Sequence, residues 1–259
     1  MKRDVSKKQV LDRIRENITR KGHHVYIVSG GAKPRFAYTI GVSESIGVEL
    51  VLAGAIFYLK TDVIQIVNSI VTQLKAQPDC KVFEINGQGL FTLRKVDVSW
   101  VASLMLGALD YYKVGEISAL QIVPDRGHWT IDIPDLSKPW SATTEPVWQW
   151  MHQPWTYPVP EGAMVATNLV ALRGGRITEA MRWDEDEWEI FAGNGSNVEE
   201  ENMRVVPLGT LVATDESLVP VVNLGIGEGL LRDAAPDSEW RTWRKKETES
   251  NAPGNGMVQ

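Results

Sequence analysis

The chain of 259 residues contains one cysteine, Cys80, and no long apolar run. A single cysteine excludes an internal disulfide and any metal site built from a cysteine cluster. It also fits a reducing compartment. No apolar run reaches the roughly 18 residues that a membrane-spanning helix needs, and the opening residues MKRDVSKKQV lack the apolar core of a secretion signal. We therefore expect a cytoplasmic protein that does not enter a membrane.

The sequence also lacks the motifs that mark common catalytic sites. Gly225, Gly227 and Gly229 have the spacing of a glycine loop, but no Lys-Ser or Lys-Thr follows them and the dinucleotide fingerprint does not match. No Gly-x-Ser-x-Gly segment is present, and no two histidines have the spacing of a metal-binding helix. We predict that the protein is not an enzyme, has no catalytic residue and needs no metal or cofactor.

Charge is distributed unevenly along the chain. Residues 1–158 hold 18 Lys and Arg against 15 Asp and Glu, a net charge of +3, whereas residues 159–259 hold 9 against 18, a net charge of −9. Phosphate groups would be repelled by the acidic half, so we do not expect a nucleic-acid partner there. A basic protein partner is favoured, because opposite charge accelerates association.

The first half shows a pattern of alternating strands and helices. Two short apolar runs, Phe36–Ile40 and Val48–Ala55, flank a polar turn at residues 43–45 and predict two sheet strands. A third apolar run, Ala119–Val123, predicts a central strand. Helices are predicted over Asp62–Gln77 and Ser99–Tyr112. The first of them has a broad apolar face at helical spacing, made by Val63, Ile66, Val67, Ile70, Val71 and Leu74.

Polar side chains on or beside these strands make up a candidate pocket. Its six members are Tyr38, Thr39, Glu49, Gln121, Asp125 and Arg126. One interpretation is a small-ligand or enzymatic site. The other is structural, because an Asp in a turn commonly bonds its own backbone.

Three segments of this half carry a family resemblance. Residues 36–41 (FAYTIG), residues 47–50 (GVEL) and residues 120–127 (LQIVPDRG) occur in an order that resembles a bacterial family known as domain of unknown function 4262. That family usually has Gly-His-Pro-Glu where this chain has Gly47-Val48-Glu49, so the family's histidine is absent here. The resemblance implies no settled activity.

Composition changes sharply after the first half. Residues 134–160 contain six prolines and four tryptophans, Trp140, Trp148, Trp150 and Trp155. Prolines limit ladder bonding, and many exposed indoles would promote aggregation. We predict a connector packed against its neighbours. The predicted organisation is an α+β chain with two domains, residues 1–133 and 161–244, each with a small mixed or antiparallel sheet and packed helices. A disordered tail is predicted over residues 245–259.

The second half combines short strands with two acidic segments. We predict a hairpin from Ala163–Leu172 and Arg176–Trp183 around two glycines, a third strand at Trp188–Phe191, and a last strand near Arg204–Val206 followed by a short helix. The predicted partner-binding surface consists of two tryptophans and seven carboxylates. These residues are Trp183, Asp184, Glu185, Asp186, Glu187, Trp188, Glu199, Glu200 and Glu201.

A second resemblance covers residues 163–243. It is carried by Gly174-Gly175, Met181-Arg182, Trp188-x-Ile190-Phe191-x-Gly193, Val206-Pro207-Leu208, Arg232 and Trp240. These segments resemble immunity-protein family 33 of bacterial polymorphic toxin systems, which overlaps domain of unknown function 2185. The family's usual Asp-Ser-Gly before the tryptophan is replaced here by Glu185-Asp186-Glu187. The resemblance implies a protein that binds a cognate, basic toxin domain and occludes its active site.

Overall fold

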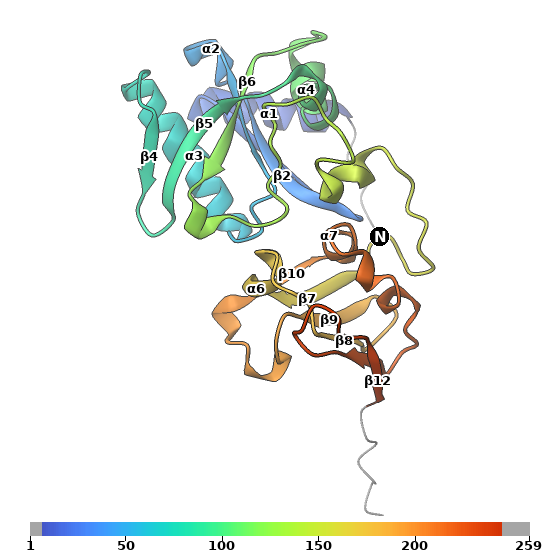
Figure 1. Cartoon of the computed structure of the whole chain (residues 1–259). Helices are drawn as coiled ribbons and strands as arrows, with labels where there is room; N and C mark the ends of the chain where they lie inside the picture. Colours follow the sequence, from blue (N-terminus) through green and yellow to red (C-terminus); the bar gives the residue numbers. More distant parts are fainter. Residues whose placement is uncertain (1–6, 245–259) are drawn as a thin grey trace, which may run out of the picture.

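The computed structural model describes residues 7–244, which form two lobes, each built on a mixed six-stranded sheet. Figure 1 shows the first lobe in blue to green and the second in yellow to red. The α+β class with two sheets is confirmed. Residues 245–259, predicted to be a disordered tail, lie outside the described residues. Within residues 7–244 no helix combines the length and apolar character needed to cross a bilayer.

The first sheet has the strand order β1-β2-β3-β6-β5-β4. Its central pair, β3 and β6, is parallel, and the other neighbours are antiparallel. The strands are β1 (His24–Gly30), β2 (Lys33–Ile40), β3 (Glu49–Ala53), β4 (Val82–Ile85), β5 (Gly89–Lys95) and β6 (Ala119–Pro124). The predicted central strand at 119–123 is therefore confirmed. The polar turn between β2 and β3 contains one short helix, α2 (Ser43–Ile46).

Helices cover both faces of this sheet, so its central strands are buried on both sides. α3 (Lys60–Ala76) packs on one face, and all six of its predicted apolar positions are buried. α1 (Lys7–Lys21), α4 (Val98–Leu104) and α5 (Leu106–Tyr112) contribute to the core of the other face. Successive side chains of a strand point to opposite faces of the sheet, so β2 contributes to both cores. Ala37 faces α3, whereas Phe36 and Tyr38 face the opposite way.

The single helix predicted over Ser99–Tyr112 is wrong, because the chain forms two helices that meet at Met105. Met105 has φ −106° and ψ 30°, outside the helical region. The break brings α5 close to β2, where the Gly107 N–H donates to the Tyr38 hydroxyl at 3.1 Å. A Cβ atom at position 107 would lie 2.4 Å from that oxygen. The change of direction therefore depends on a glycine and a buried tyrosine from distant parts of the chain.

The second sheet has the order β10-β7-β9-β8-β11-β12. Its strands are β7 (Met164–Asn168), β8 (Glu179–Arg182), β9 (Glu187–Phe191), β10 (Met203–Pro207), β11 (Glu228–Leu231) and β12 (Arg241–Arg244). β7 pairs in parallel with β9 and antiparallel with β10. Two short helices, α6 (Leu169–Leu172) and α7 (Leu208–Val212), follow β7 and β10.

The hairpin predicted around Gly174 and Gly175 is wrong, since β7 does not pair with β8. Asn168 ends β7 and accepts a hydrogen bond from the Ala171 N–H at 3.0 Å, which starts α6 and turns the chain away from the sheet. The strand at 188–191 is confirmed as β9. The strand near 204–206 is confirmed as β10, but it is not the last strand, because β11 and β12 follow.

Residues 134–160 contain no strand and include one 3-10 helix, η2 (Pro146–Met151). Gln121 in β6 holds the start of this segment, since its amide donates to the Pro134 carbonyl at 2.7 Å and accepts from the Leu136 N–H at 3.1 Å. Trp148 is buried and packs against Trp100 and Phe36. The segment thus contributes to the core of the first lobe, as Figure 1 shows for η2 beside β2.

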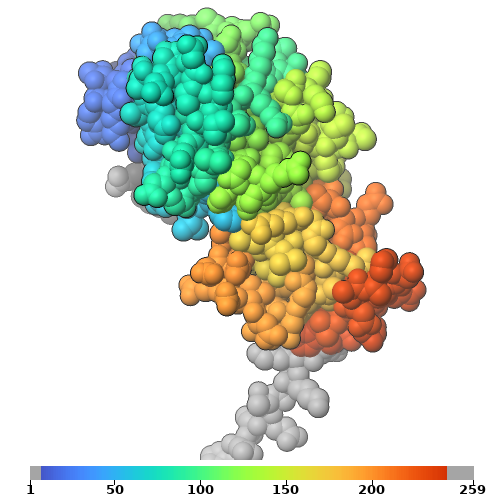
Figure 2. All heavy atoms as spheres, turned by 60° about the vertical axis from the view of Figure 1, so that its left-hand side comes forward, coloured from blue at the N-terminus to red at the C-terminus, as the bar shows by residue number. Residues whose placement is uncertain are grey.

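The two lobes share a junction in which side chains and backbone interlock. Trp150 of η2 donates to the Gly209 carbonyl of α7 at 3.1 Å. The Ile131 N–H donates to the Leu172 carbonyl at 2.8 Å, and Ala32 belongs to the core of the second lobe. Figure 2 shows the lobes meeting at a waist.

We predict that Trp148→Ala lowers the free energy of unfolding by about 3–5 kcal/mol, because a buried indole leaves a cavity. The change also removes the hydrogen bond from the indole to the Asp132 carbonyl, which is 2.9 Å long. Urea denaturation measures the loss. Trp129→Ala is the matched control, since Trp129 is 36% exposed. Equal losses in the two variants would contradict a core role for residues 134–160.

Asp132, whose carbonyl accepts the Trp148 indole N–H, also makes the stability of the fold depend on pH. Its side chain is fully buried, one oxygen accepts the Ile56 N–H at 3.1 Å, and burial raises the pKa of this carboxyl above its ordinary value of 3.8. A raised pKa in the folded state means that stability is highest while the group is protonated and falls as pH rises from about 4 through the folded pKa.

We therefore predict that Asp132→Asn flattens the fall in unfolding free energy above pH 4, because the amide cannot ionise. Urea titrations at a series of pH values from about 4 to 8 measure the profile. Asp79→Asn, at an exposed position, should leave the profile of the parent unchanged. A variant whose stability difference from the parent is constant over this range would refute the assignment.

Candidate functional site

The two acidic segments of the predicted partner-binding surface lie at opposite ends of the second sheet. Glu187 pairs with Met164 at the start of β7, whereas Met203, which follows Glu201, pairs with Asn168 at its end. Five residues of strand separate these ends by about 13 Å. The structure therefore does not join the carboxylates into one cluster, and each segment is a separate acidic patch.

The first patch is the tip of the β8–β9 hairpin, residues 183–187. Arg182 fixes its backbone by donating to the Asp184 carbonyl at 3.2 Å and the Glu185 carbonyl at 2.9 Å. All four carboxylate residues of the tip are exposed. Because one guanidinium holds the main chain, the acidic side chains project from a defined turn.

Trp188 does not belong to this surface. Its side chain is 2% exposed and lies in the core of the second lobe, where the Arg182 guanidinium stands 5.1 Å from the ring centre. The prediction of Trp188 as a partner contact is corrected to a core residue, since it sits on the inward side of β9. Trp183 is 36% exposed and is the aromatic side chain that this tip presents.

The second patch lines a groove between the lobes. Its volume is about 1050 Å³, and both lobes supply its walls. The first lobe contributes the chain before α3 and the turn between β4 and β5, and the second lobe contributes the segment leading into β10. The lining residues are Phe57, Tyr58, Leu59, Asp62, Gly87, Gln88, Glu199, Glu200, Glu201, Met203 and Arg204.

The groove is strongly acidic. It carries four carboxylates, those of Asp62 and Glu199–Glu201, against a single guanidinium. That guanidinium, on Arg204, donates to the carbonyls of Phe57 at 2.9 Å, Glu201 at 2.8 Å and Met203 at 2.7 Å. The Arg204 guanidinium therefore bonds to backbone carbonyls that form the groove, and it does not pair with one of the four carboxylates. Leu59, 60% exposed, adds an apolar contact point at the rim.

Phe57 anchors the two walls to each other. The guanidinium groups of Arg173 and Arg204, both from the second lobe, lie 5.8 Å and 5.5 Å from its ring centre, and His128 meets it edge-on at 4.8 Å. Arg173 also donates to the Gly127 carbonyl at 2.6 Å. Cation–π contacts of this kind favour a fixed relation between the walls.

The predicted pocket around Tyr38, Thr39 and Glu49 is wrong, because these side chains satisfy one another inside the core. Glu49 is fully buried. One carboxylate oxygen accepts from the Gly41 and Ser43 N–H groups at 3.0 Å and from the Tyr112 hydroxyl at 2.5 Å, and the other accepts from Thr39 at 2.5 Å. Burial and the bond to Glu49 raise the pKa of Tyr112. With four donors in place, Glu49 fixes the β2–β3 connection.

The other three members of that pocket lie elsewhere. Gln121 holds the start of the 134–160 segment, as described above. Asp125 accepts from the N–H groups of Leu90 and Gly127 at 2.8 Å and pairs with His128 at 2.8 Å. Burial alone would raise the pKa of Asp125, but the bonds from Leu90, His128 and Gly127 outweigh it and the pKa is lowered. Arg126 is exposed at the end of β6, far from Glu49.

The sequence predictions included only Glu199–Glu201 among the groove residues. They missed, among others, Phe57, Leu59, Asp62 and Arg204. Leu59 and Asp62 resemble ordinary helix-start residues, and Arg204 lies about 140 positions later in the chain. No local pattern links them. Among the described residues, no group of three His, Cys, Asp or Glu side chains is arranged to hold a metal ion.

Comparison with known proteins gives one match. Residues 17–130 match the family model described as Domain of unknown function (DUF4262), which confirms the resemblance carried by the segments at 36–41, 47–50 and 120–127. The match does not extend beyond residue 130. No curated protein and no solved structure matches the chain.

The Glu49 network yields a prediction that separates a structural role from a ligand-binding one. Glu49→Gln should lower the free energy of unfolding by about 1–3 kcal/mol, because the amide replaces one acceptor with a donor that faces other donors. Chemical denaturation measures the change, and Glu44→Gln on the exposed side of α2 is the control. If the Glu49→Gln variant is as stable as the parent, Glu49 does not stabilise the fold, and a role in ligand binding is favoured instead.

Proposed function

We propose that the chain is an immunity-type protein that binds a cognate bacterial toxin domain and neutralises it by covering its active site. The observation that carries the proposal is the groove between the lobes, in which four carboxylates face one guanidinium that bonds to the backbone. A basic loop of the toxin would enter this groove. Leu59 would supply apolar contact at the rim.

The electrostatics support a basic protein as the partner. Toxins that act on nucleic acid or its machinery are often basic, so carboxylates imitate the charge of their substrate. Residues 159–259 have a net charge of −9, which attracts such a partner over a Debye length of about 8 Å at physiological salt. Charges at a rim mainly raise the association rate.

The hairpin tip provides a second contact in this proposal. Trp183 stands beside four exposed carboxylates there, and an exposed aromatic within a charged rim is a common interface arrangement. An interface of standard size buries about 800 Å² on each partner. That area is wide enough to include patches separated by one short strand.

The resemblance of residues 163–243 to immunity-protein family 33 points to the same function. Two of its features have clear structural roles. Arg232 donates to the Ile177 carbonyl at 2.6 Å and stacks on Trp240 at 4.1 Å. These contacts stabilise the end of the second sheet, so Arg232 and Trp240 have structural roles. The surfaces proposed to contact the toxin are the groove and the hairpin tip.

We predict that the triple variant Glu199→Gln, Glu200→Gln, Glu201→Gln slows association with the cognate toxin domain about tenfold at low salt. The reason is the loss of three groove charges that steer a basic partner. Stopped-flow or surface-binding kinetics at two salt concentrations measure the effect. The difference from the parent should shrink at high salt because mobile ions screen it.

The matched control removes three exposed carboxylates from the first lobe, Glu16→Gln, Glu44→Gln and Glu84→Gln. Its net charge equals that of the groove variant. Any difference between the two variants in association rate is therefore due to the position of the removed charges. A separate variant neutralises residues 184–187 and measures the hairpin tip alone. The proposal fails if the groove variant, folded by circular dichroism, binds and protects toxin-expressing cells as well as the parent and the control.

A further inference from the structure

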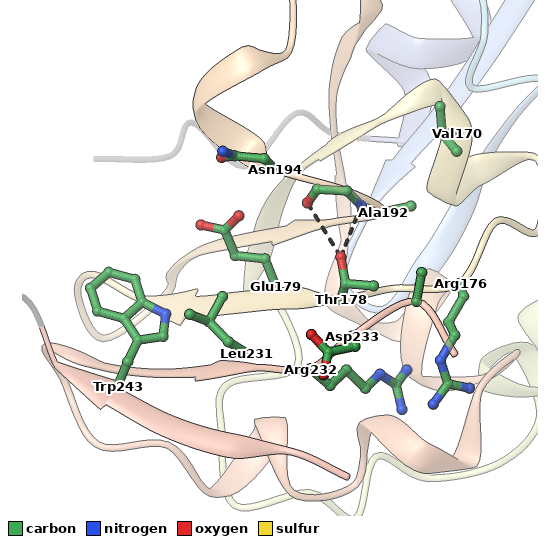
Figure 3. A pocket seen from close by; sticks show the side chains of 12 residues that line it. Val170, Arg176, Thr178, Glu179, Ala192, Asn194, Leu231, Arg232, Asp233 and Trp243 are labelled. Carbon is green, nitrogen blue, oxygen red and sulfur yellow. Dashed lines mark hydrogen bonds between the residues drawn. The ribbon is translucent and has the colours of Figure 1, made fainter. Parts of the chain in front are cut away.

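A second cavity lies on the second lobe and shares no lining residue with the groove. Its volume is about 860 Å³, within the range of about 300–1000 Å³ typical of small-molecule sites. It is formed where the ends of β8 and β9 approach the chain after β11 and the strand β12. Figure 3 shows Arg176 at one end of this cavity and Trp243 at the other.

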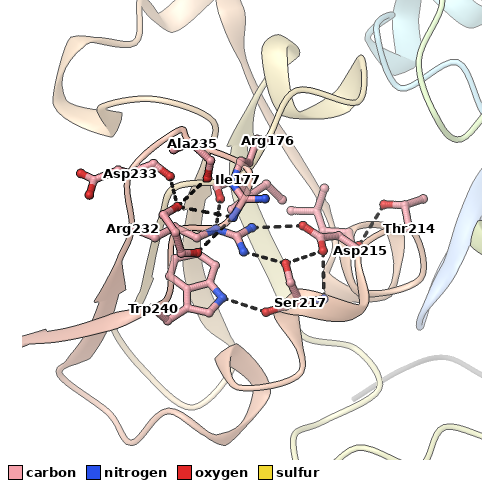
Figure 4. Close-up of polar contacts among 11 residues, drawn as sticks. Arg176, Ile177, Thr214, Asp215, Ser217, Arg232, Asp233, Ala235 and Trp240 are labelled. Carbon is pink, nitrogen blue, oxygen red and sulfur yellow. Dashed lines mark hydrogen bonds and ion pairs between the residues drawn. The ribbon is translucent and has the colours of Figure 1, made fainter.

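The polar end of the cavity contains two adjacent arginines. Figures 3 and 4 both show the guanidinium groups of Arg176 and Arg232 close together. Arg232 is engaged on three sides, by the Ile177 carbonyl at 2.6 Å, Ser217 at 2.7 Å and Asp215 at 3.2 Å. Burial, and then the charge of Arg176, lower the pKa of Arg232.

Arg176 is the less satisfied of the two. It donates to the Ser238 carbonyl at 3.1 Å and hydroxyl at 3.4 Å, and its Nε is buried without a partner among residues 7–244. No ion pair of Arg176 is present in that part of the chain. Two carboxylates also line the cavity. Asp233 pairs with Arg241 at 3.0 Å, and Glu179 accepts the Gly195 N–H at 2.9 Å, so neither forms an ion pair with Arg176.

The rest of the cavity combines apolar side chains with the polar residues Thr178, Glu179 and Asn194. Val170, 57% exposed, forms part of its rim, and Leu231 and the indole of Trp243 line the end opposite Arg176. Arg176 is half-buried and has no carboxylate partner among residues 7–244, so its charge favours an anion. An aromatic ring and aliphatic side chains at the far end favour a flat apolar body.

We propose that this cavity binds a small organic acid with an aromatic body. Its carboxylate would lie against Arg176, where it supplies the missing counter-charge beside two guanidinium groups, and its ring would lie between Leu231 and Trp243. The cavity and the acidic groove share no lining residue. Ligand binding and toxin binding are therefore tested with different variants.

The test uses 3-phenylpropionate as the probe and the full chain labelled with ¹⁵N. We expect saturable shifts of the Trp243 indole N–H signal. The neutral 3-phenylpropionamide should bind at least about tenfold more weakly, since it cannot form a charge-assisted hydrogen bond with Arg176. Arg176→Gln should weaken the acid by the same factor and leave the amide unchanged.

Two further variants keep the test decisive. Arg94→Gln removes one exposed arginine of the first lobe and should bind the acid like the parent. Val170→Trp fills the rim and should block binding while Arg176 remains. The proposal is overturned if the acid gives no saturable shift up to about 10 mM, if acid and amide bind equally, or if a folded Arg176→Gln variant binds as the parent does.

Discussion

The arrangement of the two lobes depends on the close approach of Gly209 to the first lobe. A Cβ atom at this position would lie 2.9 Å from the Ala32 carbonyl oxygen and 2.9 Å from the Trp150 indole nitrogen. Both distances are shorter than van der Waals contact, so a larger residue would push α7 away from η2. The groove has one wall from each lobe, and Gly209, which does not line it, belongs to the contact that holds the two lobes together.

Local periodicity allowed part of the fold to be predicted. The apolar face of α3 follows from the spacing of Val63, Ile66 and the residues after them, because helical period is a property of neighbouring positions. Strand pairing is different. Gly174 and Gly175 resemble a hairpin turn, yet Asn168 begins a helix before the chain reaches them. The actual neighbours of β7 are β9 and β10, and nothing near these strands in the sequence specifies that choice.

The candidate sites show why polar residues in strands are difficult to interpret from sequence. Glu49 resembles a site residue because a carboxylate in an apolar strand is costly to bury. Three of its four donors lie within residues 39–43 and the fourth is Tyr112, and only the folded chain shows that they satisfy it. Glu199–Glu201 are exposed, as expected for three consecutive carboxylates, which rarely enter a core. Their position opposite Asp62 could not be predicted, because it depends on how the lobes meet.

The parallel pairing of β3 with β6 has a consequence for how the first lobe is made. Glu49 pairs with Ala119, so about 70 residues must be synthesised before this central edge of β3 finds its neighbour. During that interval α3 and the β4–β5 hairpin have all their local contacts available, whereas the apolar strand Glu49–Ala53 exposes unpaired backbone. Non-local pairing of this kind slows folding, and an open apolar edge invites association between chains. On a ribosome adding about 5–20 residues per second, the strand remains uncovered for several seconds, which makes the centre of the finished sheet the most vulnerable part of the nascent chain.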